Sequence, residues 1–385
     1  MELIVYAPVW GQSGFEQLSR GLLLALDQMG VAVELRSAHE WNSERVGLPE
    51  SVISRLHRMS KTRVSELAPH VIYQLPKGQP VHPNAPAVCF TLFETDRCPA
   101  LWVDSLTKMD RVFVFSEFNR ASWSETGIDS KMLGRLPVAV DSFLYNPDGP
   151  KLEIENAKGF KFLLSGDFTE RKNFEAVIEA YVKEFTSIDP VTLIVKAHYG
   201  GFVKKNRRDC MNRISECVQR FASKNCPRIL FWGDKISNHS MAALYRSVDC
   251  FVLASRGEGL GMQYLEAMAS GIPVIACDWG AQTDYLTREN SYPVVSTLKI
   301  IDDPHYIMKC PQALNSRWCH VDVNDLQNTM RHVVSNPNER REKAAVSLKW
   351  AREQTWQKMA VEFVNHILSM YDPVKKEQVL EMEAA

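Results

Sequence analysis

Two glutamates stand close together in a glycine-rich stretch of the second half of the chain. Residues 255–276 read SRGEGLGMQYLEAMASGIPVIA, and seven residues separate Glu258 from Glu266. An ionised carboxylate only accepts hydrogen bonds, so both side chains suit hydroxyl donors such as those of a sugar ring or a ribose. The alternative is that both glutamates are solvated charges, one on a loop and one on a helix, as most isolated pairs of glutamates are.

The elements around these glutamates are expected to bring them to one ligand. A strand over 251–254 ends before the glycines, and a helix over about 262–270 follows them. The helix start offers unpaired N–H groups and the positive end of its dipole, which favour a phosphate. Glu258 then lies in the loop at the carboxyl edge of a sheet and Glu266 a little over one turn into the helix. The residues expected to line this site are Gly259, Leu260 and Gly261.

This run resembles the E-x7-E region of retaining GT-B glycosyltransferases of the family 4 kind, which include bacterial mannosyl- and glucosyltransferases. The resemblance rests on Glu258, Gly259, Gly261, Glu266, Ala267, Met268, Gly271, Pro273 and Val274. It implies that Glu258 contacts the donor sugar and Glu266 the ribose of the nucleotide.

A second match is Ser165-Gly166-Asp-Phe-Thr-Glu-Arg171-Lys172-Asn173, directly after an expected strand and at the start of an expected helix. It resembles the diphosphate clamp of the same family, in which Gly166 lies beside the donor. A sugar that leaves a nucleoside diphosphate transfers negative charge to the bridging oxygen, and two cations at a helix start stabilise that charge without a metal. Arg171 and Lys172 are the candidates, against the alternative of a solvated pair.

Four further residues are candidates for contacts to the donor or the acceptor. Gly11 and Gly14 lie in the first loop between a strand and a helix, where the alternative is a tight turn and nothing else. Glu94 stands where many relatives place a histidine, and it either hydrogen-bonds the acceptor or sugar or caps a turn. Trp232 ends an expected strand and either stacks on the base or packs in the core. Further candidates to line the cleft that would hold the donor and the acceptor are Lys196, Ser116 and Glu117.

Composition excludes several other classes of protein. Lys and Arg number 45 against 46 acidic residues, so no overall positive field attracts nucleic acid. The nine cysteines show no metal-ligand spacing, which indicates reduced thiols in the cytoplasm. No D-x-D dyad and no HExxH motif occurs, so we expect neither a metal nor another cofactor. No signal peptide is expected at the amino terminus, and no apolar run reaches the roughly 18 residues that span a bilayer.

The order of expected elements predicts an α/β protein of GT-B architecture. Short β-branched runs alternate with amphipathic stretches on both sides of a turn-rich segment near 137–150. We therefore expect two Rossmann-like domains that face each other across a cleft, and the family resemblance implies that the C-terminal helices cross back to the first. The predicted bounds are 1–145 for the acceptor-side domain, 150–350 for the nucleotide-sugar domain, 351–372 for the returning helix and 373–385 for a disordered tail.

The predicted function is transfer of a hexose from a GDP- or UDP-sugar to a glycan, a lipid or another saccharide. The family resemblance implies that the configuration at the anomeric carbon is retained. Since no nucleophile is evident in the sequence, the resemblance also implies a front-face mechanism. A sugar-nucleotide epimerase, a phosphorylase and a non-catalytic sugar-nucleotide-binding protein stay open. A basic helix over 51–67 could make a weak peripheral contact with the inner membrane face, although a solvated helix face is the commoner case.

Overall fold

The computed structural model describes all residues except 12, 38–46, 77–82, 199–203, 223–224 and 371–385. The chain forms two units. The first comprises Met1–Phe93, Arg97–Ala139 and the residues from Gln354 onward, and the second comprises Glu94–Asp96 and Val140–Glu353. The predicted tail, 373–385, lies outside the described residues.

The first unit is built on a six-stranded parallel sheet with the strand order β2-β1-β3-β4-β5-β6. Its strands are β1 (Glu2–Ala7), β2 (Ala32–Ser37), β3 (His70–Tyr73), β4 (Ala87–Phe90), β5 (Arg111–Val114) and β6 (Leu133–Arg135). Its helices are α1 (Gly14–Gln28), α2 (Glu50–Lys61), α3 (Ala100–Leu106), α4 (Glu117–Glu125) and α12 (Trp356–Leu368).

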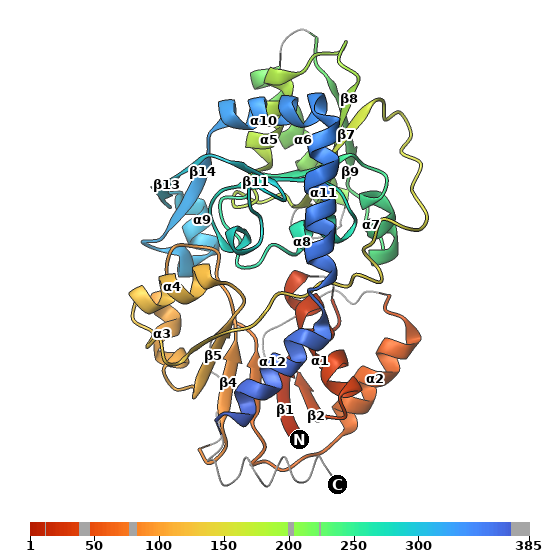
Figure 1. Ribbon diagram of the computed structural model, residues 1–385. Coiled ribbons are helices and arrows are strands. Elements are labelled where there is room, and N and C mark those ends of the chain that lie inside the picture. The colour runs from red at the N-terminus through yellow and green to blue at the C-terminus, as the bar shows by residue number, and fades with distance from the viewer. Residues whose placement is uncertain (12, 38–46, 77–82, 199–203, 223–224, 371–385) are drawn as a thin grey trace. The chain divides into compact units, whose positions relative to one another are not determined.

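Helix α12 comes from the far end of the sequence and packs on α1 of the first unit (Figure 1). A Cβ atom on Gly21 would lie 2.4 Å from the Trp356 ring, so a residue without a side chain allows this close approach. On the sheet side, the Phe363 ring meets the edge of the Phe90 ring at 5.0 Å between centroids. The C-terminal helix is thus part of the hydrophobic core of the first unit.

The second unit contains another six-stranded parallel sheet, with the order β12-β11-β10-β7-β8-β9. Its strands are β7 (Phe160–Asp167), β8 (Val191–His198), β9 (Arg228–Trp232), β10 (Cys250–Leu253), β11 (Val274–Cys277) and β12 (Tyr292–Val294). Its α-helices are α5 (Phe174–Glu184), α6 (Lys204–Phe221), α7 (Asn238–Tyr245), α8 (Met262–Ala269), α9 (Pro304–Lys309), α10 (Val323–Ser335) and α11 (Pro337–Arg352).

The order of strands in this sheet reverses between β7 and β10. The chain runs outward from β7 to β8 and β9 on one side, and from β10 to β11 and β12 on the other. Crossovers from these two strands therefore leave in opposite directions, and the loops at their carboxyl ends lie at the position where open α/β sheets form their ligand-binding crevice. The segments after β7 and β10 are those that hold Arg171, Lys172 and Glu258.

The predicted fold class, two parallel α/β sheets with helices, is confirmed. Several elements were not predicted, notably β6, β12 and the antiparallel hairpin of β13 (Ser296–Ile300) and β14 (Arg317–Val321). Four of the five residues of β13 are exposed, so the strand lacks the apolar run that marks the buried strands. Periodicity therefore gave no signal for it.

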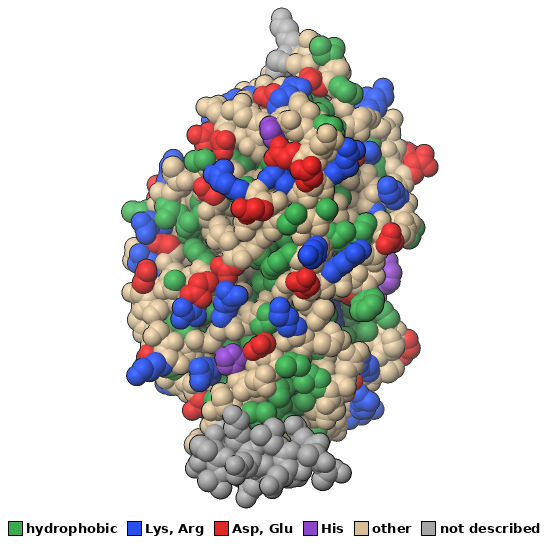
Figure 2. All heavy atoms as spheres, viewed as in Figure 1, with side chains coloured by type: hydrophobic (Ala, Val, Ile, Leu, Met, Phe, Trp, Pro, Cys, Tyr) green, Lys and Arg blue, Asp and Glu red, His purple; other side chains and the backbone are tan. Residues whose placement is uncertain are grey.

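Charge is distributed without a dominant sign on the visible surface. Figure 2 shows basic and acidic side chains interspersed over one face of the molecule, in keeping with a net charge of −1. Among the described residues, none of the helices has the length and apolar character that a membrane crossing needs.

Candidate functional site

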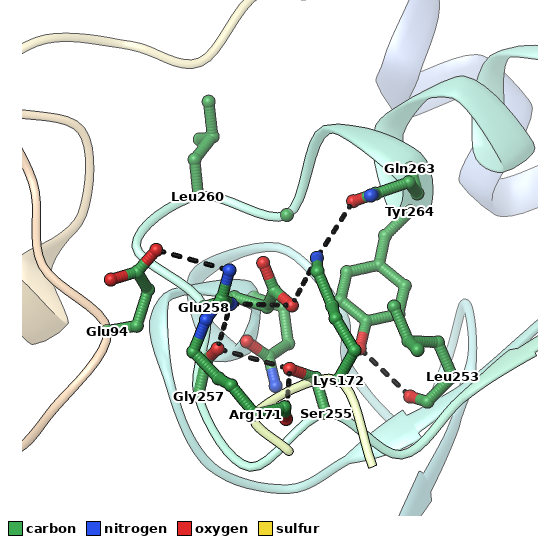
Figure 3. A network of polar contacts seen from close by, with 12 residues as sticks. Glu94, Arg171, Lys172, Leu253, Ser255, Gly257, Glu258, Leu260, Gln263 and Tyr264 are labelled. Atoms are coloured by element: carbon green, nitrogen blue, oxygen red, sulfur yellow. Dashed lines mark hydrogen bonds and ion pairs between the residues drawn. The ribbon is translucent and has the colours of Figure 1, made fainter. Parts of the chain in front are cut away.

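Glu258 lies in the loop that follows β10, and two cations hold its carboxylate. The Lys172 ammonium donates to Glu258 Oε1 at 2.7 Å, and Arg171 Nη1 lies 3.3 Å from the same oxygen (Figure 3). The side chains of Lys172 and Glu258 are only 7% and 6% exposed. The predicted clamp and the first predicted glutamate are therefore one buried ion cluster at the crevice of the second sheet.

Arg171 also connects this cluster to Glu94. Its Nη2 lies 3.3 Å from Glu94 Oε1, and its Nη1 donates to the carbonyl of Gly257 at 2.7 Å. The peptide carbonyl of Glu94 comes so close that a Cβ atom on Gly257 would lie 1.9 Å from it. Glu94 is thus an ion-pair partner of Arg171, in place of the histidine that the resemblance led us to expect.

Short polar contacts fix the backbone that carries the two cations. Asn173, with a φ of 52°, is the N-cap residue just before α5, and its side-chain amide donates to the carbonyl of Ala254 at 3.1 Å. The Arg256 N–H donates to the carbonyl of Arg171 at 2.8 Å. The loop after β7 is therefore held directly against the loop after β10.

The charges within the cluster set its protonation. Burial alone would raise the pKa of the Glu258 carboxyl, but Lys172 and Arg171 outweigh it and hold that pKa below its usual value. Burial lowers the pKa of the Lys172 ammonium, against the opposing effect of Glu258. Burial also disfavours the charged Arg171, but Glu94 and Glu258 raise its pKa above the ordinary range. The charges of the cluster thus favour the ionised forms of Glu258 and Arg171, while burial disfavours that of Lys172.

Gly261 forms the junction between this loop and α8. Its φ is +82°, a left-handed conformation that favours glycine, and it caps the start of the helix. The Tyr285 hydroxyl donates to the carbonyl of Leu260 at 2.6 Å, while the Leu260 side chain points away from the ion cluster (Figure 3). Gly259 lies buried in the same loop. The start of α8 thus follows Glu258 closely along the chain, and unpaired backbone N–H groups at a helix start suit a phosphate.

Glu266 lies on α8 and belongs to a separate buried network. Its Oε2 accepts a hydrogen bond from the Tyr245 hydroxyl at 3.0 Å. Burial raises the pKa of the Glu266 carboxyl to about 7, against the lowering effects of Tyr245, Tyr145 and Lys172. Lys172 therefore acts on both predicted glutamates, while only Glu258 bonds to it directly.

The carboxyl ends of β7, β8 and β9 carry the remaining candidates of this unit. Gly166, with a φ of +149°, precedes the last residue of β7. Lys196 is buried, and burial lowers its pKa to about 8, against the raising effect of Asp234. In the parallel register Lys196 stands opposite Trp232, which is half-buried at the end of β9. An indole at this position is accessible enough to meet a planar base.

The candidates of the first unit make local contacts. The Gly11 N–H donates to Glu16 Oε1 at 2.6 Å, and Ser13 and Glu16 form a capping box at the start of α1, whose first residue is Gly14. Ser116 caps α4, and Glu117 pairs with Arg120 at 2.5 Å. Local structure therefore accounts for the capping roles of Ser13, Glu16 and Ser116.

The sequence did not single out three residues that complete these networks. The Gln263 side chain accepts a hydrogen bond from Lys172 at 3.4 Å, and Tyr145 and Tyr245 surround Glu266. Gln263 lies in the first turn of the helix after Glu258, a position that could have drawn attention. The tyrosines lie 121 and 21 residues before Glu266, so no local spacing indicates them.

Comparison with known proteins first gives the class of the fold. The chain aligns with the structure of HepE from Anabaena in complex with UDP and glucose, with a TM-score of 0.62 and 12% identity, over 96% of this chain and 100% of that one. The architecture is therefore GT-B. In sequence, residues 159–299 match the family model "Glycosyl transferases group 1". The match covers β7 to β12, most of β13, and Arg171, Lys172 and Glu258.

Two curated proteins are similar over shorter parts of the chain. The lipopolysaccharide core biosynthesis mannosyltransferase LpsB of Rhizobium meliloti is 42% identical over 74 residues, which is 19% of this chain and 20% of that protein. The alpha-monoglucosyldiacylglycerol synthase of Streptococcus pneumoniae is 32% identical over 138 residues, 33% of this chain and 29% of that protein. The resemblance to GT-B glycosyltransferases is therefore confirmed in the fold and in the sequence of the second unit. The aligned parts span less than a third of the length of either curated relative.

Proposed function

We propose that the protein is a retaining glycosyltransferase that moves a hexose from a nucleoside diphosphate-sugar to an acceptor hydroxyl. The observation that carries the proposal is the buried cluster of Arg171, Lys172 and Glu258 at the crevice of the second sheet, beside the start of α8. Cations and a helix start suit a diphosphate, and a carboxylate beside them suits sugar hydroxyls.

In the proposed reaction the bond between the anomeric carbon and the phosphate oxygen breaks, and the acceptor oxygen bonds to that carbon from the same face. The acceptor proton passes to the departing phosphate. Negative charge grows on the bridging oxygen, where Arg171, Lys172 and the N–H groups of α8 stabilise it. Glu258 accepts hydrogen bonds from the transferred sugar, and Glu266 from the ribose.

The donor is proposed to be a UDP- or GDP-hexose, with Trp232 and Lys196 next to the base. HepE is described with UDP and glucose, which supports UDP as the nucleotide, and LpsB is a mannosyltransferase, which supports a hexose as the sugar. A glycan, a lipid or another saccharide is the proposed acceptor, since one relative glycosylates a lipopolysaccharide core and another makes a glycolipid.

We further propose a cytoplasmic location, supported by nine cysteines that are all free thiols. The basic face of α2 supports a membrane contact only weakly. Arg55 pairs with Asp27 at 2.6 Å and Arg58 pairs with the same carboxylate, so two of its cations are already neutralised.

The test is a time course of donor hydrolysis followed by proton NMR. UDP-glucose and GDP-mannose are each incubated with the protein in the presence of EDTA, without acceptor. Slow release of the nucleoside diphosphate, with the α-anomer of the free sugar appearing first, supports a retaining transferase that uses no metal. Appearance of a free epimerised sugar would instead identify an epimerase, and tight binding of a donor that is never cleaved would identify a binding protein.

A further inference from the structure

Glu266 accepts hydrogen bonds from two buried tyrosines that come from different segments. Tyr245, at the last position of α7, donates to Oε2 at 3.0 Å. Tyr145, in the segment between β6 and β7, also bonds the carboxyl, and its ring meets the edge of the Tyr245 ring at 5.8 Å between centroids. All three side chains are buried, so this carboxyl has little access to water.

The same contacts leave the carboxyl between its two protonation states near neutral pH. Burial raises its pKa to about 7, while the hydrogen bonds from Tyr245 and Tyr145 and the charge of Lys172 lower it. These groups come from α7, from the segment after β6 and from the loop after β7. Among the described residues, α11 and β11, which also pack on α8, add no charged group to this set. Two tyrosine hydroxyls and one cation therefore oppose the effect of burial.

We propose that Tyr145 and Tyr245 are positioning residues that orient Glu266 and favour its ionised form, so that binding of the donor strengthens as pH rises through neutrality. The inference rests on the proposed function, in which Glu266 accepts from the ribose. It adds the residues that prepare the carboxylate for that contact and a pH dependence that follows from them.

The physical reason is the number of acceptors that the carboxyl can offer. An ionised carboxylate has about four lone-pair positions, so it can accept from two tyrosines and from both hydroxyls of a ribose. A protonated carboxyl uses one oxygen as a donor, so it can no longer accept fully from all four groups. Ribose binding therefore favours ionisation, and by linkage ionisation favours ribose binding.

Each tyrosine hydroxyl should thus shift the titration of Glu266. A hydrogen bond to a charged group is worth enough to move a pKa by about one unit. Tyr145→Phe and Tyr245→Phe remove one donor each and keep the ring, so each raises the midpoint by about one pH unit. Near pH 7, where the carboxyl is half ionised, this makes donor binding about fivefold weaker.

The experiment measures affinity for UDP-glucose and GDP-mannose by calorimetry as a function of pH. Nucleotide sugars are chosen because their phosphodiester groups do not titrate near neutrality, whereas a free diphosphate does. Wild type is expected to bind more tightly above about pH 7, Glu266→Gln to show no such dependence, and the Tyr→Phe variants to show the dependence shifted upward. Tyr181→Phe is the matched control, because Tyr181 is buried in the same unit and its hydroxyl bonds to the carbonyl of Arg228 at 2.8 Å, outside this network.

A second readout needs no ligand. Infrared difference spectra identify the protonated carboxyl band that disappears in Glu266→Gln, and the pH at which it titrates is compared across the variants. A higher midpoint in both Tyr→Phe variants, together with the shifted binding profile, supports the inference. Weaker binding by the same factor at every pH, with an unshifted carboxyl band, would mean that the tyrosines serve packing only. If the carboxyl band shifts but neither nucleotide sugar binds, the proposed function is wrong and the predicted effect on donor binding fails with it. The effect of the tyrosines on the pKa of Glu266 would still hold.

Discussion

Removal of Lys172 separates the structural from the chemical role of the ion cluster. In Lys172→Met the buried carboxylate of Glu258 loses its closest charged partner, at 2.7 Å, and keeps the more distant Arg171 at 3.3 Å. Removing one member of a buried pair costs about 3 to 5 kcal/mol, and the remaining guanidinium places the expected loss near the lower end of that range. Turnover of the donor is expected to fall by roughly tenfold to a thousandfold, the range for loss of one preorganised charge contact.

The double variant Lys172→Met with Glu258→Gln distinguishes the two effects. No uncompensated carboxylate is left in it, so the free energy of unfolding is expected to return to within about 1 kcal/mol of wild type. Turnover is expected to stay low, because two of the groups proposed to contact the donor are gone. Lys183→Met is the matched control, since it removes an exposed pair with Glu179 within α5 and should change stability by less than about 1 kcal/mol.

Denaturant unfolding of the four proteins and single-turnover kinetics with saturating donor provide the measurements. An unchanged midpoint in Lys172→Met would contradict the buried pair. Recovery of turnover in the double variant would show that Lys172 acts on stability alone and would refute its role beside the diphosphate.

Three further predictions concern the same unit. Arg171→Ala is expected to lower turnover by roughly tenfold to a thousandfold, and Arg171→Lys by less. Near-normal steady-state rates in both variants would show that Arg171 has a structural role only. Activity is expected to survive EDTA, which a chelation assay with Mg²⁺ or Mn²⁺ added back checks directly. Glu266→Gln is expected to stabilise the ligand-free protein above pH 7 by up to about 3 kcal/mol. The pKa of the Glu266 carboxyl is about 7 in the folded protein and lower in the unfolded chain, so the free energy of unfolding of the wild type falls as pH rises above the pKa of the unfolded chain. Thermal unfolding below pH 4 and above pH 7 measures the difference, and an equal gain at both would exclude ionisation as its cause.

The fold could be predicted because its signals are local. Buried parallel strands such as Phe251–Leu253 are continuous apolar runs, and α8 begins after a glycine with a left-handed φ. Strand order is not local, since β7 pairs with β10 across 88 residues between Phe162 and Cys250. The crevice at the reversal of that order therefore became visible only in the structure.

The candidate site was predicted by residue type but not by partner. Arg171, Lys172 and Glu258 were expected as separate contacts to phosphate and sugar, and the structure shows that they form one ion cluster. Lys172 and Glu258 are 86 residues apart in sequence, so no local spacing indicates the contact between them. The tyrosines around Glu266 were missed for the same reason, because a buried tyrosine looks like core until its hydroxyl is seen to bond a carboxylate.

Glu258 is proposed to contact the transferred sugar, and Glu266 the ribose, of one donor molecule. Calorimetric titration of wild type, Glu258→Gln and Glu266→Gln, first with the nucleoside diphosphate and then with the intact nucleotide sugar, tests it most directly. Glu266→Gln is expected to weaken both ligands, since the ribose is present in each. Glu258→Gln is expected to leave the nucleoside diphosphate nearly unaffected and to weaken the nucleotide sugar or its turnover. Equal losses for both ligands in both variants would contradict this division between the two carboxylates.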